Sequence, residues 1–136
     1  MTSVVPAVIA GLAVGIFLIA YFANHHNPVY TWSDQDIIVY SHTLDEVQAF
    51  YARYDEPEPR ADITRIGTTT IVYYQAFRSW SITDDAADDY TKELRLTITI
   101  DPFGRMTKGL ECASSVSYGL AATVESIKTN ECLETA

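Results

Sequence analysis

The chain has 136 residues and a formal net charge of −9, from 18 acidic and 9 basic side chains. So acidic a chain is not expected to bind nucleic acid or to dock on anionic lipid headgroups, since both are negatively charged. After the N-terminal apolar segment about a hundred residues remain, which is enough for one small domain with a modest core, and we expect no second domain.

Residues 4–23 have the sequence VVPAVIAGLAVGIFLIAYFA, a run of twenty residues without a charge. A helix of this length spans about 30 Å, the thickness of the hydrocarbon layer of a bilayer. A cleaved signal peptide is the alternative, but its apolar core is usually about 7 to 15 residues long and follows basic residues, which are missing here. We therefore expect residues 1–3 to form a short N-terminal tip and residues 4–23 an uncleaved transmembrane helix.

Small residues recur along this segment at Ala7, Gly11 and Gly15, so they would share one face of a helix. Small side chains allow the close backbone approach by which helices associate in lipid. The alternative is that Gly and Ala are simply common in membrane helices. We favour packing against other transmembrane subunits through these three residues.

The positive-inside rule says little about the orientation of the expected transmembrane helix, because the first basic residue of the chain is Arg53. We expect a single-pass protein of the cell membrane with a cytoplasmic N-terminus and an extracytoplasmic C-terminal domain. An interfacial belt would contact the lipid bilayer through Tyr21, Phe22, Tyr30 and Trp32. Residues 24–35 would be a juxtamembrane linker, in which His25 and His26 are weak metal candidates because adjacent side chains diverge and a third ligand is missing.

Residues 36–136 are expected to form a small α+β domain. Residues 36–40, DIIVY, are predicted to be a strand, and a helix follows with Thr43 and Glu46 as a capping box. The helix is expected to stop at Asp55, ahead of two prolines. Residues 63–66, 69–78 and 93–100 have strand patterns, the last with Leu94, Leu96, Ile98 and Ile100 on one face.

The end of the domain is predicted to be a hairpin followed by a helix. Residues 101–104, DPFG, have the composition of a type I turn, and residues 105–112 would return as the next strand. Residues 117–130 have apolar side chains at helical spacing. The predicted fold class is thus one N-terminal transmembrane helix plus an antiparallel sheet of about four strands with two helices and one disulfide.

An acidic loop contains Asp84, Asp85, Asp88 and Asp89. The spacing does not fit an EF-hand, whose central Gly and final Glu are missing. We interpret the loop as a solvated hairpin connection, with weak binding of a divalent cation as the alternative. No metal site is predicted, and no cofactor is expected.

Cys112 and Cys132 are the only cysteines in the chain. Their spacing does not resemble a redox motif or a metal site, so a disulfide is expected, in keeping with an oxidising, extracytoplasmic location. The alternative is two free buried thiols in a reducing compartment.

The segments FYARYD (residues 50–55) and LRLTITIDP (residues 94–102), a strand ending in Glu111 and Cys112, and the single apolar segment resemble the small single-pass exported proteins of ammonia-oxidising archaea. The resemblance implies an extracytoplasmic α+β module. It also implies an accessory subunit of a membrane complex such as the copper-dependent ammonia monooxygenase. It carries over no catalytic residue.

The sequence predicts no enzymatic activity, because His42 is the only histidine of the domain and a glycine-rich phosphate loop is missing. We expect a non-catalytic accessory or stabilising subunit of a multi-subunit membrane complex, which packs by its transmembrane helix and its extracytoplasmic domain. The alternative is a freestanding membrane-anchored binding module for a small solute or cation, with the acidic loop as its site.

Overall fold

The computed structural model describes residues 27–80 and 90–134. Several expected features lie outside these ranges: the helix at residues 4–23 with Ala7, Gly11 and Gly15, the belt residues Tyr21 and Phe22, the pair His25 and His26, and the acidic side chains Asp84, Asp85, Asp88 and Asp89. The described part of the chain begins at Asn27, beside a short 3-10 helix, η1 (Val29–Thr31).

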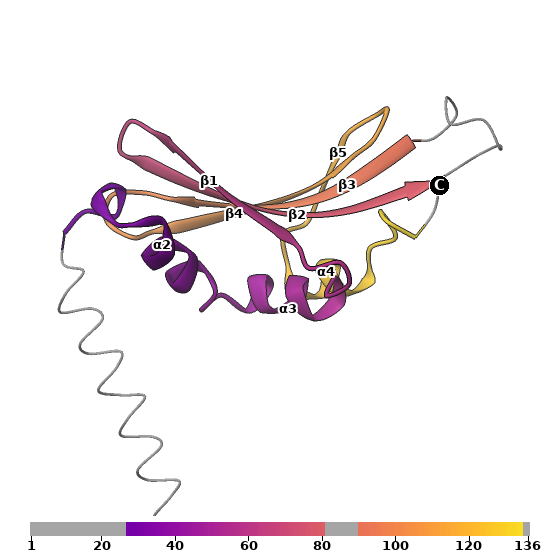
Figure 1. Ribbon diagram of the computed structural model, residues 1–136, viewed down its shortest axis with the longest axis horizontal. Coiled ribbons are helices and arrows are strands. Elements are labelled where there is room, and N and C mark those ends of the chain that lie inside the picture. Colours follow the sequence, from indigo (N-terminus) through magenta and orange to yellow (C-terminus); the bar gives the residue numbers. More distant parts are fainter. Residues whose placement is uncertain (1–26, 81–89, 135–136) are drawn as a thin grey trace, which may run out of the picture.

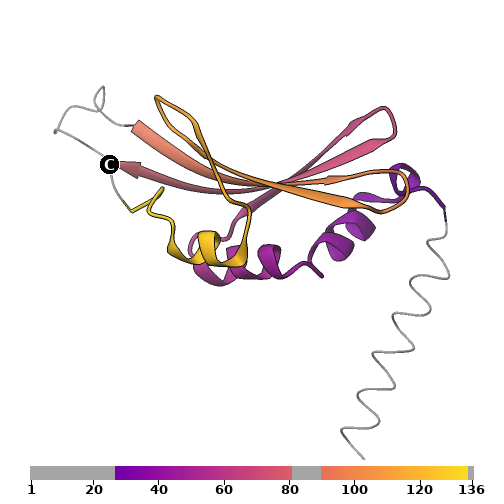
Figure 2. The same cartoon turned by 180° about the vertical axis from the view of Figure 1, so that it is seen from behind.

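A single antiparallel sheet organises the described residues. Its five strands pair in chain order: β1 (Arg60–Ile66), β2 (Thr69–Trp80), β3 (Tyr90–Ile100), β4 (Met106–Ala113) and β5 (Tyr118–Leu120). The helices are α2 (Asp34–Ser41), α3 (Asp45–Arg53) and α4 (Val124–Thr129). Figures 1 and 2 show all three helices on the same face of the sheet, with no element over the other face among the residues described.

Strand β3 lies at the centre of the sheet, between β2 and β4. As its alternating pattern predicted, Leu94, Leu96, Ile98 and Ile100 are fully buried toward the helices. Val47 and Phe50 of α3 and Ile37 of α2 are buried with them. The core therefore lies entirely between one face of the sheet and the helical layer.

The predicted fold class was wrong in its elements. The described residues form a sheet of five strands and three α-helices, where about four strands and two helices were expected. Within the described ranges no helix has both the length and the apolar composition needed to cross a membrane.

Residues 36–40 belong to helix α2, so the predicted strand was wrong. Ser33 is the N-cap, and its hydroxyl accepts a hydrogen bond from the amide of Asp36 at 3.2 Å. The acidic side chains of Asp34 and Asp36 lie in the first turn and stabilise the helix, because this end of the helix dipole is positive. A short apolar run does not distinguish a strand from a buried helix. Here the Ser33 cap favours the helix.

Helix α3 was predicted correctly, but its capping box was not. The N-cap is Leu44, with no side-chain cap. Thr43 instead donates to the carbonyl of Tyr40 at 2.7 Å, because it still belongs to the turn that ends α2. Glu46 pairs with Lys108 of β4 at 2.8 Å, and the hydrogen bond from Lys108 lowers the pKa of Glu46.

The C-terminal segment is fastened to the rest of the domain at several points. The disulfide between Cys112 and Cys132 is confirmed, and it joins β4 to the residues after α4. The predicted helix at residues 117–130 is shorter, because residues 118–120 pair with β4 as β5. Arg53, in the last turn of α3, donates to the carbonyl oxygens of Ile127 and Asn130 at the end of α4.

We predict that replacing both cysteines, Cys112→Ala with Cys132→Ala, lowers the free energy of unfolding by roughly 3 kcal/mol, because the bond closes a loop of 20 residues that is otherwise free in the unfolded chain. Urea unfolding under non-reducing conditions measures the loss. Ser115→Ala, an exposed change within the same loop, is the control and should leave the midpoint unchanged. A loss below about 1 kcal/mol for the double variant would contradict the expected role.

A second prediction concerns alkaline pH. Burial raises the pKa of Tyr74 from 10.0 to about 12, although the hydrogen bond with Ser41 acts in the opposite direction. The phenol therefore ionises more readily in the unfolded chain, so the roughly 3 kcal/mol by which the neutral phenol favours the folded state is present below pH 10 and is lost between pH 10 and 12. Unfolding followed across this range should give a flatter curve for Tyr74→Phe than for the wild type. Identical curves would contradict the assignment.

Candidate functional site

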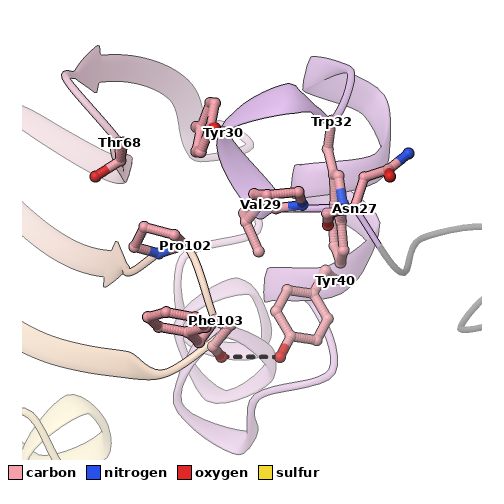
Figure 3. A pocket seen from close by; sticks show the side chains of 10 residues that line it. Asn27, Val29, Tyr30, Trp32, Tyr40, Thr68, Pro102 and Phe103 are labelled. Atoms are coloured by element: carbon pink, nitrogen blue, oxygen red, sulfur yellow. Dashed lines mark hydrogen bonds between the residues drawn. The ribbon is translucent and has the colours of Figure 1, made fainter.

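Three segments that are distant in sequence meet at one end of the sheet. They are η1 with its neighbours (residues 27–32), the turn between β1 and β2 (residues 66–69) and the turn between β3 and β4 (residues 101–105), and we call them together the aromatic end. Together with Tyr40 of α2 they line an open cavity of about 620 Å³. Figure 3 shows Tyr30, Trp32, Tyr40, Pro102 and Phe103 around it. The described chain begins at the same end, with Asn27.

Hydrogen bonds hold η1 against the β3–β4 turn. The amide of Val29 donates to the carbonyl of Pro102 at 3.3 Å, and the Trp32 indole donates to the carbonyl of Asn27 at 2.9 Å. The Trp32 ring packs edge-on against Tyr40 with centroids 5.3 Å apart. Residues 27–32 are therefore held against the β3–β4 turn.

The β3–β4 turn is itself rigidly built, as the Asp-Pro-Phe-Gly sequence predicted. The amide of Gly104 donates to the carbonyl of Asp101 at 3.0 Å, and the Asp101 carboxylate accepts from the amides of Phe103 and Arg105. Gly104 has φ +84°, which favours glycine. The Tyr40 hydroxyl donates to the Gly104 carbonyl at 3.0 Å, the contact drawn in Figure 3, and so braces the turn from α2.

Apolar side chains on the aromatic end are exposed. Phe103 is 85% exposed, Ile66 63% and Tyr30 39%. A phenylalanine so exposed in a tight turn contributes little to the core, because almost none of its surface is removed from water. The fold therefore does not account for this side chain.

The uncovered side of the sheet, which we call the open face, is the second candidate. Its side chains on the two longest strands are Ile71, Tyr73, Gln75 and Phe77 of β2 and Glu93, Arg95, Thr97 and Thr99 of β3. Register places Tyr73 opposite Thr97, and Gln75 opposite Arg95. This face combines aromatic, amide and guanidinium groups, a mixture that is enriched at protein interfaces.

The charged side chains of the open face on β3, Glu93 and Arg95, are paired with each other. Arg95 binds Glu93 through two nitrogens at 2.8 and 3.2 Å, and the Gln75 amide donates to the same carboxylate at 2.8 Å. The hydrogen bonds that Arg95 donates to the Glu93 carboxylate raise the pKa of Arg95. The guanidinium carbon of Arg95 also lies 5.6 Å from the centre of the Tyr73 ring. A shallow depression of about 230 Å³ lies over Tyr73, Gln75 and Arg95.

One polar cluster within the core contains groups that are familiar from catalysis. Ser41 is fully buried, its hydroxyl donates to the Ile38 carbonyl at 3.0 Å, and it shares a hydrogen bond with Tyr74. The half-buried His42 packs beside this cluster, with its ring centre 4.9 Å from that of Tyr51. Burial lowers the pKa of His42. Because Ser41 has no solvent access and its hydroxyl is bound, the cluster stabilises the contact of α2 with the sheet and presents no nucleophile.

The described residues contain no group of three or more His, Cys, Asp or Glu side chains placed to hold a metal ion. The metal candidates from the sequence, His25, His26 and the acidic loop, lie outside the described ranges. The candidate sites among the described residues are therefore apolar and aromatic at one end of the sheet and mixed in character on the open face.

Of the residues predicted from sequence to form the interfacial belt, Tyr30 and Trp32 both line the cavity of the aromatic end. Phe103 and Tyr40 join them there but were not singled out, since Phe103 was interpreted only as a turn residue and Tyr40 as part of a strand. A signal was present, because the central positions of tight turns usually hold small or polar residues. The grouping itself required the sheet register.

Comparison with known proteins gives no match to a protein-family model, to a curated protein or to a solved structure.

The bracing of the β3–β4 turn can be tested with a matched pair of glycine substitutions. Gly67 and Gly104 both have positive φ, but a Cβ at Gly104 would lie 3.3 Å from the Tyr40 hydroxyl, whereas one at Gly67 would have nothing within 4 Å. Both alanine variants should lose about 1–2 kcal/mol through backbone strain. Gly104→Ala should lose about 1 kcal/mol more, because the Tyr40 hydrogen bond is displaced. Urea midpoints measure the difference, and equal losses would show that Tyr40 does not brace the turn.

Proposed function

We propose that the chain is a non-catalytic accessory or stabilising subunit of a multi-subunit membrane complex. In this proposal the apolar segment of residues 4–23 holds the chain at the cell membrane, and the domain binds an extracytoplasmic part of its partner. The observation that carries the proposal is the one-sided packing of the sheet, which leaves an open face containing aromatic residues and an internally neutralised ion pair.

An antiparallel sheet often has one face in water, and such a face is usually rich in unpaired charged and small polar residues. The open face differs on β2, where Ile71, Tyr73 and Phe77 alternate with the buried positions and Phe77 is 43% exposed. Because Glu93 already pairs with Arg95 and Gln75, covering β2 and β3 on this face would not leave either of these two charges alone. The open face is thus suited to contact with a protein.

Two features support the proposed location. The uncharged run at residues 4–23 is long enough to enter a bilayer, and the Cys112–Cys132 disulfide is typical of an oxidising compartment. The finer proposal rests on the resemblance to exported proteins of ammonia-oxidising archaea, which favours a partner of the ammonia monooxygenase type. Packing within the membrane would use Ala7, Gly11 and Gly15.

We expect the chain, extracted from its native membranes in mild detergent and separated on a native gel, to migrate with larger membrane proteins at a fixed stoichiometry that mass spectrometry measures. The variant Tyr73→Ala with Phe77→Ala removes two aromatic groups of the open face and leaves the Glu93–Arg95 pair intact. It should reduce co-migration at least about tenfold, as loss of interface aromatics commonly does. Gly11→Leu with Gly15→Leu should reduce it through the membrane segment.

The matched control is Glu125→Ala with Lys128→Ala, two exposed positions of α4 on the helical side. It should co-migrate like the wild type. Migration of the wild-type chain alone, near its own 15.2 kDa plus detergent, would discard the subunit role and favour a freestanding binding module for a small solute or cation. Full co-migration of the Tyr73 and Phe77 variant would show that the open face is not the interface with the partner.

A further inference from the structure

We infer that the aromatic end inserts into the interfacial layer of the lipid bilayer, with Phe103 as its most deeply placed side chain. The inference rests on the proposed attachment of residues 4–23 to a membrane, and it adds a lipid-binding surface formed by the folded domain itself. The occupant to which we commit is the headgroup and upper acyl region of uncharged phospholipids.

The length of chain between the apolar segment and the domain limits their separation. Four residues lead from Ala23 to Asn27, and fully extended they cover at most about 14 Å. Asn27 is hydrogen-bonded to Trp32 and belongs to the aromatic end. If Ala23 lies at the edge of the hydrocarbon layer, the aromatic end is within reach of the headgroups.

The exposed side chains of the aromatic end are of the types that favour this depth. Tyr and Trp are enriched at membrane interfaces, and an exposed Phe gains free energy when it leaves water. Phe103, Ile66 and Tyr30 come from three separate segments that converge on one end of the sheet. Phe103 is held outward by a turn that Asp101 and Tyr40 fix, so its insertion costs little conformational freedom.

The charge of the aromatic end also favours contact with uncharged phospholipids. Residues 27–32 and 66–69 contain no charged side chain, and residues 101–105 contain one Asp and one Arg, so the three segments sum to zero. The whole chain carries −9. The aromatic end is therefore a neutral area of an acidic protein, and it can approach zwitterionic headgroups without the repulsion that anionic lipids would impose on the rest of the surface.

The experiment uses the full chain in phosphatidylcholine nanodiscs, with a nitroxide spin label on one introduced cysteine at a time: Phe103→Cys, Ile66→Cys or Val116→Cys. The native cysteines form a disulfide and do not react under non-reducing conditions. Val116 is the control because it is 73% exposed and lies in the β4–β5 loop, at the opposite end of the sheet. Relaxation measurements then compare collisions of each label with oxygen, which partitions into lipid, and with a water-soluble nickel complex.

We expect an oxygen-to-nickel collision ratio several-fold higher at positions 103 and 66 than at position 116. Equal ratios at the three positions, in chains that remain with the nanodiscs, would overturn the inference and leave the proposed attachment intact. Exclusion of both reagents at position 103 would also overturn it, since it would indicate a protein occupant such as a second copy or the chain's own residues 21–22. Elution of the chain apart from the nanodiscs would refute the attachment itself, and the inference with it.

Discussion

The alternating pattern of β3 is the constraint on which the rest of the domain depends. Leu94, Leu96, Ile98 and Ile100 point to one face, and the polar residues between them point to the other. Since β3 is paired on both sides, a shift of register by one residue would exchange the two faces of the whole sheet. All apolar burial is thereby directed to one side, and the helices must collect there.

A single-sided core in so short a chain is small, and the C-terminal segment shows how it is reinforced. Helix α4 has only six residues and would not persist by itself. It is held by the disulfide, by Arg53 donating to the carbonyls at its end, and by Arg78 donating to the Leu133 carbonyl at 2.9 Å. These contacts hold α4 beside α3 on the helical side of the sheet.

Sequence patterns predicted well those elements whose local signal and tertiary role agree. The alternation of β3, the stripe of α3, the turn at Gly104 and the disulfide were all predicted, because each depends on residues close in sequence or on the chemistry of cysteine. Residues 36–40 were misassigned because a five-residue apolar run is compatible with two structures. Residues 118–120 form a strand because they pair with the edge of β4. The local sequence pattern does not reveal this pairing.

The candidate sites were likewise predicted only where their residues have a local sequence signal. Tyr30 and Trp32 were singled out for their position beside the apolar segment, but their association with Phe103 depends on the β3–β4 turn reaching back to η1, more than 70 residues away along the chain. On the open face, the hydrogen bond from Gln75 to Glu93 could not be anticipated, because these two residues meet only through the pairing of β2 with β3.

The two proposed surfaces are compatible in space, because the strands run lengthwise from the aromatic end. If that end rests in the bilayer interface, β2, with its 12 residues, extends about 40 Å from it. The plane of the open face would then lie along the membrane normal, so the face would point sideways rather than toward lipid. A neighbouring membrane protein with an extracytoplasmic portion of that height is the partner such a surface can contact, whereas a small solute would need only the shallow depression near Tyr73 and would leave most of the face uncovered.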